Sequence, residues 1–139
     1  MKKRMFAIPL AAALVLAGCG QRYTRSFGDS EMYSVEEIAM AMDTVEDEFE
    51  QDDYYSRCDL HSLEFDGDAE MTDGELERAK LCCKNNGLPE PDEVIRLAGE
   101  FTSPIFDTGA LDSCTNYQWN YSLGRRNGGK WFIYDRGVG

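Results

Sequence analysis

The sequence predicts an α+β domain: an N-terminal helix packed on a curved antiparallel sheet of about four strands, with a short second helix, all after a cleaved signal peptide. Three observations lead to this fold class. Apolar residues recur at helical spacing over 34–50, and apolar and polar residues alternate over 117–123, the period of a half-buried strand. Asn127-Gly128-Gly129 is typical of a β-hairpin turn.

The amino terminus has the parts of a bacterial signal peptide. Lys2, Lys3 and Arg4 supply positive charge, and residues 5–17 that follow carry no charge. A membrane-spanning helix needs roughly twenty apolar residues to cross the hydrocarbon core, and this segment is shorter. We therefore expect it to direct export and then to be cleaved.

Leu16-Ala17-Gly18-Cys19 resembles the lipobox of bacterial lipoproteins. The resemblance implies a diacylglycerol on the Cys19 thiol and cleavage after Gly18; the alternative is an ordinary secretory signal that happens to contain a cysteine. Two or three acyl chains hold a protein stably on a bilayer. The expected organisation is a signal peptide over 1–18, the lipidated cysteine with a flexible tether over 19–33, and one extracytoplasmic domain over 34–139. The expected location is the outer side of the cell membrane, or the outer membrane if the host has two membranes.

The charge of the chain limits its partners. The formal net charge is −12, and loss of the basic leader makes the mature protein more acidic. Such a surface repels phosphate backbones, so nucleic acid is not an expected partner. An acidic coat also keeps a protein soluble, which is the simpler explanation.

Two helices are predicted from their capping residues. Ser34 and Glu37 have capping-box spacing at the start of a helix over 34–50. Thr72 and Glu75 repeat that spacing before a helix at about 73–85, which Asn86-Gly87 ends. The apolar stripe of the first helix is most simply core and consists of Ile38, Met42, Val45 and Phe49.

Strands are predicted over 57–65, with a bulge, over 94–102, over 117–123 and over 131–134. The length of the hairpin loop decides which residues of the last strand share the face of Trp119. A two-residue loop would place Phe132 and Tyr134 there, and a three-residue loop would place Trp131 and Ile133 there. We favour the three-residue loop, which leaves Phe132 and Tyr134 on the other face as a candidate binding surface.

Four cysteines remain beyond Cys19, and an even number in an exported domain predicts two disulfides. A bond between the adjacent Cys82 and Cys83 would be strained, so Cys58 and Cys114 are each expected to pair with one of these two, in an order the sequence leaves open. The alternative is a metal site, but the spacing and the single histidine, His61, do not fit zinc.

No catalytic motif is present, and we expect no cofactor. His61 alone is more often structural than catalytic. One acidic segment has partial EF-hand spacing, but methionine occupies the position that requires glycine. An acidic surface loop is the simpler explanation of this weak calcium candidate, whose ligands would be Asp66, Asp68, Glu70, Thr72 and Glu77.

A longer pattern resembles a family of small, uncharacterised lipoproteins of Gram-positive bacteria. The residues that carry it are Ser34-Val35-Glu36-Glu37-Ile38, Ala41, Met42, Phe49, Leu60, Phe65, 94–101, Tyr117-x-Trp119-x-Tyr121-x-Leu123-x-Arg125 and Gly129-Lys130-Trp131-x-Ile133-x-Asp135-x-Gly137. The resemblance implies a cystatin-like or nuclear-transport-factor-like roll, in which a helix packs on a curved sheet. The cysteines and residues 68–92 are not part of the pattern. Such rolls host many functions, so the fold implies none.

The leading hypothesis is a non-enzymatic domain, held to the membrane by lipid on Cys19, that binds a protein or a small ligand. The second is a hydrolase or isomerase that uses carboxylates near Tyr121 and Asp135 in the cavity of the roll. The third is a structural envelope component without a ligand. A concave face that is filled by the first helix would argue against the second.

Overall fold

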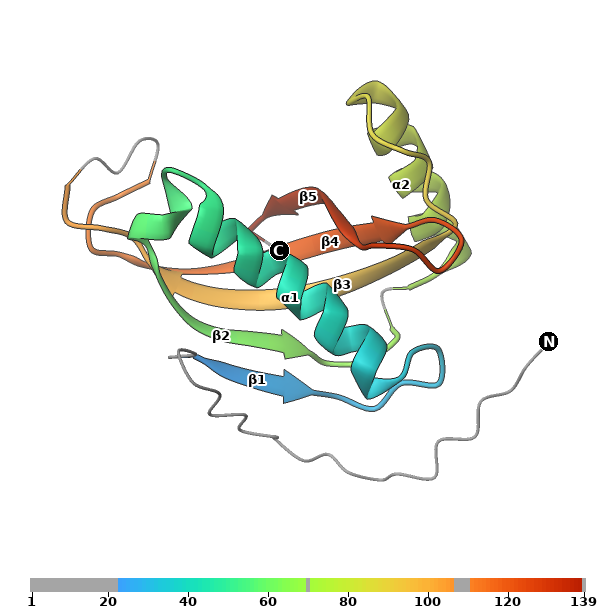
Figure 1. The fold of residues 1–139 in the computed structure, drawn as a ribbon, viewed down its shortest axis with the longest axis horizontal. Coiled ribbons are helices and arrows are strands. Elements are labelled where there is room, and N and C mark those ends of the chain that lie inside the picture. The colour runs from blue at the N-terminus through green and yellow to red at the C-terminus, as the bar shows by residue number, and fades with distance from the viewer. Residues whose placement is uncertain (1–22, 70, 107–110, 139) are drawn as a thin grey trace.

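The computed structural model describes residues 23–69, 71–106 and 111–138. In this part of the chain two helices and a short 3₁₀ turn surround one five-stranded mixed sheet with the order β1-β2-β3-β4-β5 (Figure 1). The predicted signal peptide, Cys19 and Glu70 lie outside the described residues. The elements are β1 (Thr24–Phe27), α1 (Val35–Gln51), η1 (Tyr55–Arg57), β2 (Asp59–Phe65), α2 (Asp73–Asn85), β3 (Glu93–Thr102), β4 (Asn116–Arg125) and β5 (Phe132–Gly137).

Both predicted helices are confirmed, together with the residues that begin them. The Ser34 side chain accepts a hydrogen bond from the Glu37 N–H, and the Glu37 carboxylate accepts one from the Ser34 N–H, which completes the capping box of α1. Thr72 caps α2 through the Glu75 N–H. The predicted apolar stripe of α1 is buried against the sheet.

The structure corrects the prediction at the start of the domain. Residues 19–33 were expected to be a flexible tether, but Thr24–Phe27 forms β1, which precedes α1 and pairs in parallel with β2. The sheet therefore has five strands and is mixed, not antiparallel throughout. Tyr23, Phe27 and Tyr33 are buried in the main core. The alternation in this strand is hidden because its central inward residue is an arginine, Arg25.

Arg25 can be buried because α1 supplies its counter-charges. Its side chain is 5% exposed, and its Nη2 lies 2.7 Å from Asp43 Oδ1 and 3.3 Å from Glu46 Oε1. Its Nε donates to the Tyr23 hydroxyl at 2.8 Å. Two acidic residues of α1 thus hold β1 at the edge of the sheet.

The hairpin of β4 and β5 has the predicted facing. Ile133 lies opposite Leu123, and Trp131 is buried in the same core as Leu123. The connection between the strands, residues 126–131, is longer than the predicted three-residue loop. A register shift in β2 between Leu60 and Ser62 confirms the predicted bulge.

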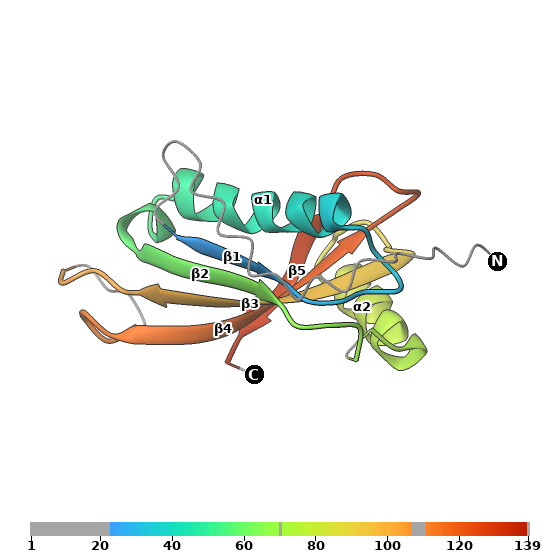
Figure 2. The ribbon, with the colours of Figure 1, turned by 90° about the horizontal axis from the view of Figure 1, so that it is seen from below.

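The two helices lie on opposite faces of the sheet (Figure 2). Most of the core lies between α1 and the sheet, and a smaller cluster under α2 contains Ala79, Cys83, Val94 and Tyr134. Neither helix of the described residues has the length and apolar character needed to cross a membrane.

Candidate functional site

The face of the sheet opposite α1 carries an open groove. The groove has a volume of about 790 Å³ and lies on β1 to β4. The helix α2 covers the other end of the same face (Figure 2). Its lining residues are Thr24, Ser26, Ser62, Leu63, Glu64, Ala98, Gly99, Glu100, Asn116, Tyr117, Gln118, Trp119, Asn120 and Val138.

The polar residues of this groove form two rows across the strands. One row is Thr24, Ser62, Glu100 and Gln118, and the next is Ser26, Glu64 and Asn120 with the apolar Ala98 between the last two. Each row consists of cross-strand neighbours, because the side chains of every second residue point to the same face of a strand. The polar part of the groove lining therefore consists mainly of hydroxyls, amides and two carboxylates, beside apolar residues that include Tyr117, Trp119 and Val138.

The two carboxylates of the groove, Glu64 and Glu100, lie on adjacent strands. Glu64 pairs with Ala98, which places Glu100 at the diagonal position, where side chains are typically about 7–8 Å apart. Glu100 accepts a hydrogen bond of 2.8 Å from the amide of Asn116. None of the described residues that line the groove is Lys, Arg or His. A positively charged group would be stabilised there by both carboxylates.

The predicted binding surface at Phe132 and Tyr134 is wrong. Both residues lie on the face away from Trp119, as predicted, but α2 covers that part of the face. Tyr134 is 7% exposed, and its hydroxyl donates a hydrogen bond of 2.6 Å to Glu75 of α2. Phe132 packs against the same small cluster. These aromatic residues pack between the sheet and α2, so Tyr134 is buried and Phe132 is half-buried.

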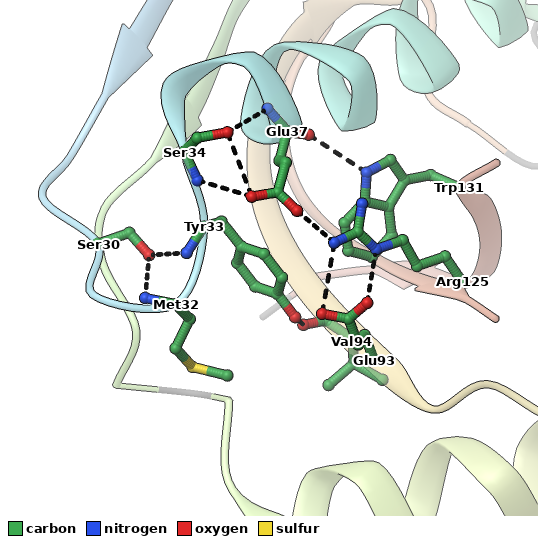
Figure 3. Close-up of polar contacts among 9 residues, drawn as sticks. All are labelled: Ser30, Met32, Tyr33, Ser34, Glu37, Glu93, Val94, Arg125 and Trp131. Atoms are coloured by element: carbon green, nitrogen blue, oxygen red, sulfur yellow. Dashed lines mark hydrogen bonds and ion pairs between the residues drawn. The ribbon is translucent and has the colours of Figure 1, made fainter. Parts of the chain in front are cut away.

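A buried arginine network lies at the end of the sheet where α1 begins (Figure 3). Arg125 of β4 is 5% exposed, donates from Nε to Glu93 at 2.9 Å and contacts Glu37 of α1 through Nη2. Its guanidinium lies 4.4 Å from the ring centroid of Trp131 and 5.6 Å from that of Tyr33. The network joins α1, β3 and β4, so we interpret it as structural.

Glu37 makes the stability of the fold dependent on pH. Burial raises the pKa of its carboxyl, but hydrogen bonds from the Ser34 backbone and from Arg125 outweigh burial and lower the pKa to about 2. A carboxyl with a lowered pKa in the folded state contributes stability above its ordinary pKa of 4.5, and this contribution is lost as the pH falls toward 2. We expect the free energy of unfolding to decrease over that window.

In the Glu37→Gln variant the free energy of unfolding should decrease less as the pH falls, because the titrating carboxyl group has been removed. Urea unfolding at several pH values between about 2 and 6 would measure it. Glu36→Gln is the matched control, since Glu36 is exposed in the same helical turn. An equal loss of pH dependence in both variants would contradict the assignment to Glu37.

Tyr121 and Asp135, the centre of the enzyme hypothesis, are not brought together. Tyr121 is fully buried under α1, whereas Asp135 lies in an ion pair with Arg78 of α2, on the other side of the sheet. The acid near Tyr121 is Glu48 of α1, which is paired with Arg136. Burial raises the pKa of Glu48, although Arg136 opposes the shift. The helix fills this face of the sheet, which is the arrangement that argues against a catalytic cavity there.

The predicted pairing of the cysteines is also wrong. All four thiols, those of Cys58, Cys82, Cys83 and Cys114, are free. Cys83 packs against Val94 near the start of β3, whereas Cys58 precedes Asp59, which pairs with Thr102 at the end of β3. Eight residues of strand span about 26 Å, and a disulfide requires Cα atoms within about 7 Å. No local pattern in the sequence indicates that Cys58 and Cys114 lie at the opposite end of the sheet from Cys82 and Cys83.

Three described members of the calcium candidate, Asp68, Thr72 and Glu77, have other partners. The Asp68 carboxylate accepts hydrogen bonds from the Ser30 hydroxyl and the Glu31 N–H, and Glu77 forms an ion pair with Lys80. Thr72 caps α2. Across residues 23–69, 71–106 and 111–138, no group of three His, Cys, Asp or Glu side chains is placed to hold a metal ion. The Nε2 atom of His61 lies 2.6 Å from the Thr102 hydroxyl, so the partner in this hydrogen bond is a hydroxyl and not a carboxylate.

The sequence analysis did not identify the residues of the groove as a binding site, although one pattern pointed to two of them. Gln118 and Asn120 alternate with the aromatic residues Tyr117, Trp119 and Tyr121 in the clearest strand of the chain, and this alternation marks them as the polar, outward face. The sequence does not show which other outward residues lie beside them, because β1, β2 and β3 come from distant parts of the chain.

None of the family models, curated proteins and solved structures compared with this chain gives a significant match.

Proposed function

We propose that the protein is a lipid-anchored, non-enzymatic binding module of the bacterial envelope that holds a cationic polypeptide segment in the groove opposite α1. The proposal retains the lipidated Cys19, the extracytoplasmic location and the likeness to Gram-positive lipoproteins with a cystatin-like or nuclear-transport-factor-like roll. It moves the binding surface from Phe132 and Tyr134 to the groove.

The observation that carries the binding proposal is the pair of carboxylates, Glu64 and Glu100, on adjacent strands of a hollow whose described lining has no basic side chain. Lys or Arg side chains of a bound segment would neutralise them, and the surrounding amides and hydroxyls can bind backbone groups. The acidic charge of the whole chain would also attract a basic segment at a distance.

The binding test uses the full-length lipidated protein and a fluorescent octalysine peptide as the probe. In the Glu64→Gln/Glu100→Gln variant we expect the affinity to fall roughly three- to thirtyfold, because two partly exposed ion pairs of about 0.3–1 kcal/mol each are removed. Fluorescence anisotropy at low and high salt would measure the change.

Asp47→Asn/Glu50→Gln is the matched control, because it removes the same charge from exposed positions on α1, on the other side of the sheet. An equal loss of affinity in both variants would show general charge attraction and would reject the groove as the site. Crosslinked cells should also yield a basic partner with the wild-type protein and not with the groove variant.

The anchor is tested separately through Cys19. The Cys19→Ser protein should not be labelled by an alkyne fatty acid, and it should keep its leader because cleavage after Gly18 no longer occurs. A variant that is still acylated and cleaved would refute the lipid anchor.

A further inference from the structure

We propose that Ile105 and Phe106, which follow the end of β3, contact the bilayer next to the lipid anchor. The inference rests on the proposed lipidation of Cys19 and adds to it the surface that meets the membrane. It follows from where the folded domain begins, and from what lies exposed at that end of the sheet.

The anchor is close to the fold. Tyr23 is already buried in the main core, so only residues 20–22 separate the folded domain from Cys19. Four residue steps span at most about 14 Å even when fully extended. The longer tether expected from the sequence would have let the domain turn freely above the membrane, whereas this short link keeps the start of β1 near the lipid.

The start of β1 identifies the end of the sheet that faces the membrane. Thr24 pairs with Ser62 in the middle of β2, and Ser62 pairs in turn with Glu100 near the end of β3. The β3–β4 connection leaves the sheet at this same end, whereas α2 lies at the opposite end (Figure 1). Two strand spacings, about 10 Å, separate β1 from β3.

The base of the β3–β4 connection is ordered by hydrogen bonds. The N–H of Ser103 donates to the Thr115 carbonyl at 2.9 Å, and the N–H of Cys114 donates to the Pro104 carbonyl at 3.0 Å. The Ser103 hydroxyl accepts from the Thr115 N–H at 3.0 Å. These bonds extend the β3–β4 ladder beyond the sheet and hold Ser103 and Pro104, the two residues directly before Ile105.

Ile105 and Phe106 follow directly and are 63% and 79% exposed. Within the described parts of the chain they are the one pair of adjacent, exposed, large apolar side chains. Exposed apolar residues at the membrane-facing end of a lipid-anchored protein can partition into the interface without any basic charge. An apolar contact is needed at this end of the sheet, because Asp52, Asp53 and Asp59 lie there and anionic headgroups would repel their carboxylates.

The test places a photocrosslinking p-benzoylphenylalanine at position 106 of the full-length lipidated protein, reconstituted in phosphatidylcholine vesicles. The matched control carries the same group at position 81, because Leu81 is 60% exposed on α2, at the far end of the sheet. After flotation and irradiation, mass spectrometry should detect a lipid adduct at position 106 and none above background at position 81.

Vesicle-bound protein without a lipid adduct at position 106, or with equal adducts at both positions, would overturn the membrane contact and leave the anchor intact. Protein that does not float with the vesicles would overturn the anchor, and the contact with it. In living cells, adducts from position 106 to protein in place of lipid would also reject the inference.

Discussion

Replacing Arg125 with alanine should lower the free energy of unfolding by about 3–5 kcal/mol, because breaking a buried ion pair leaves its partner charge uncompensated. The guanidinium contacts both Glu37 and Glu93 and lies over the ring of Trp131. Small domains have a total stability of roughly 5–15 kcal/mol, so the variant should be close to unfolding at room temperature. Urea titration followed by circular dichroism would measure the loss.

The neighbouring Arg126 provides the control. It is exposed, and its replacement by alanine should change the free energy of unfolding by no more than about 0.5 kcal/mol. An Arg125→Met variant keeps much of the apolar contact with Trp131 without the charge, and so separates packing from ion pairing. A loss below about 1 kcal/mol in Arg125→Ala would show that the network contributes little to stability.

Replacing Phe101 with alanine should cost about 3–5 kcal/mol, the usual loss for truncating a fully buried aromatic side chain. Phe101 is fully buried on β3, and its ring centroid lies 5.3 Å from that of Phe49 and 5.2 Å from that of Trp119. Edge-to-face pairs of this kind add about 0.5–1.5 kcal/mol each beyond the buried area. Thermal unfolding monitored by the fluorescence of the two tryptophans, Trp119 and Trp131, would measure the loss.

Phe106→Ala is the control for this variant. Phe106 is the same residue type at 79% exposure, so its truncation should leave the melting temperature nearly unchanged. If both variants lost the same stability, the packing around Phe101 would not be the cause. The control also shows that the loop residue proposed to meet the membrane can be altered without damage to the fold.

The losses in free energy of unfolding caused by Arg125→Ala and Phe101→Ala should be additive. Phe101 pairs with Tyr117 at one end of the β3–β4 ladder, and Arg125 pairs with Glu93 at the other. Sites this far apart with no shared partner typically add within about 0.5 kcal/mol. The variant that carries both substitutions is therefore expected to be largely unfolded. Circular dichroism without denaturant would detect its loss of secondary structure.

Local sequence patterns predicted most of the regular structure, because they report local physics. The Ser34 and Glu37 capping box marks where α1 begins, and the alternation over 117–123 marks β4 and its buried face. Where a local pattern was atypical, the prediction failed. Arg25 occupies an inward position of β1, and a segment with a charged inward residue does not have the alternation of a strand.

The candidate site could not be predicted in the same way. Gln118 and Asn120 were visible as outward residues of one strand, but their neighbours Glu100 and Glu64 come from β3 and β2. Which strands pair, and in which register, depends on long-range burial that no short pattern contains. For the same reason Phe132 and Tyr134 were assigned to the correct face and yet were wrongly expected to be free, since α2 packs on them.

The sequence by itself determined the helices, most of the strands, the facing of the hairpin and, through the lipobox resemblance, the expectation of an anchor at Cys19. The tertiary structure alone decided that β1 joins the sheet, that the cysteines lie at opposite ends, and that the groove collects two carboxylates. The physical reason is the distance along the chain over which each interaction acts. Capping and periodicity act over a few residues, whereas Arg25 is buried only because Asp43 and Glu46 reach it from α1.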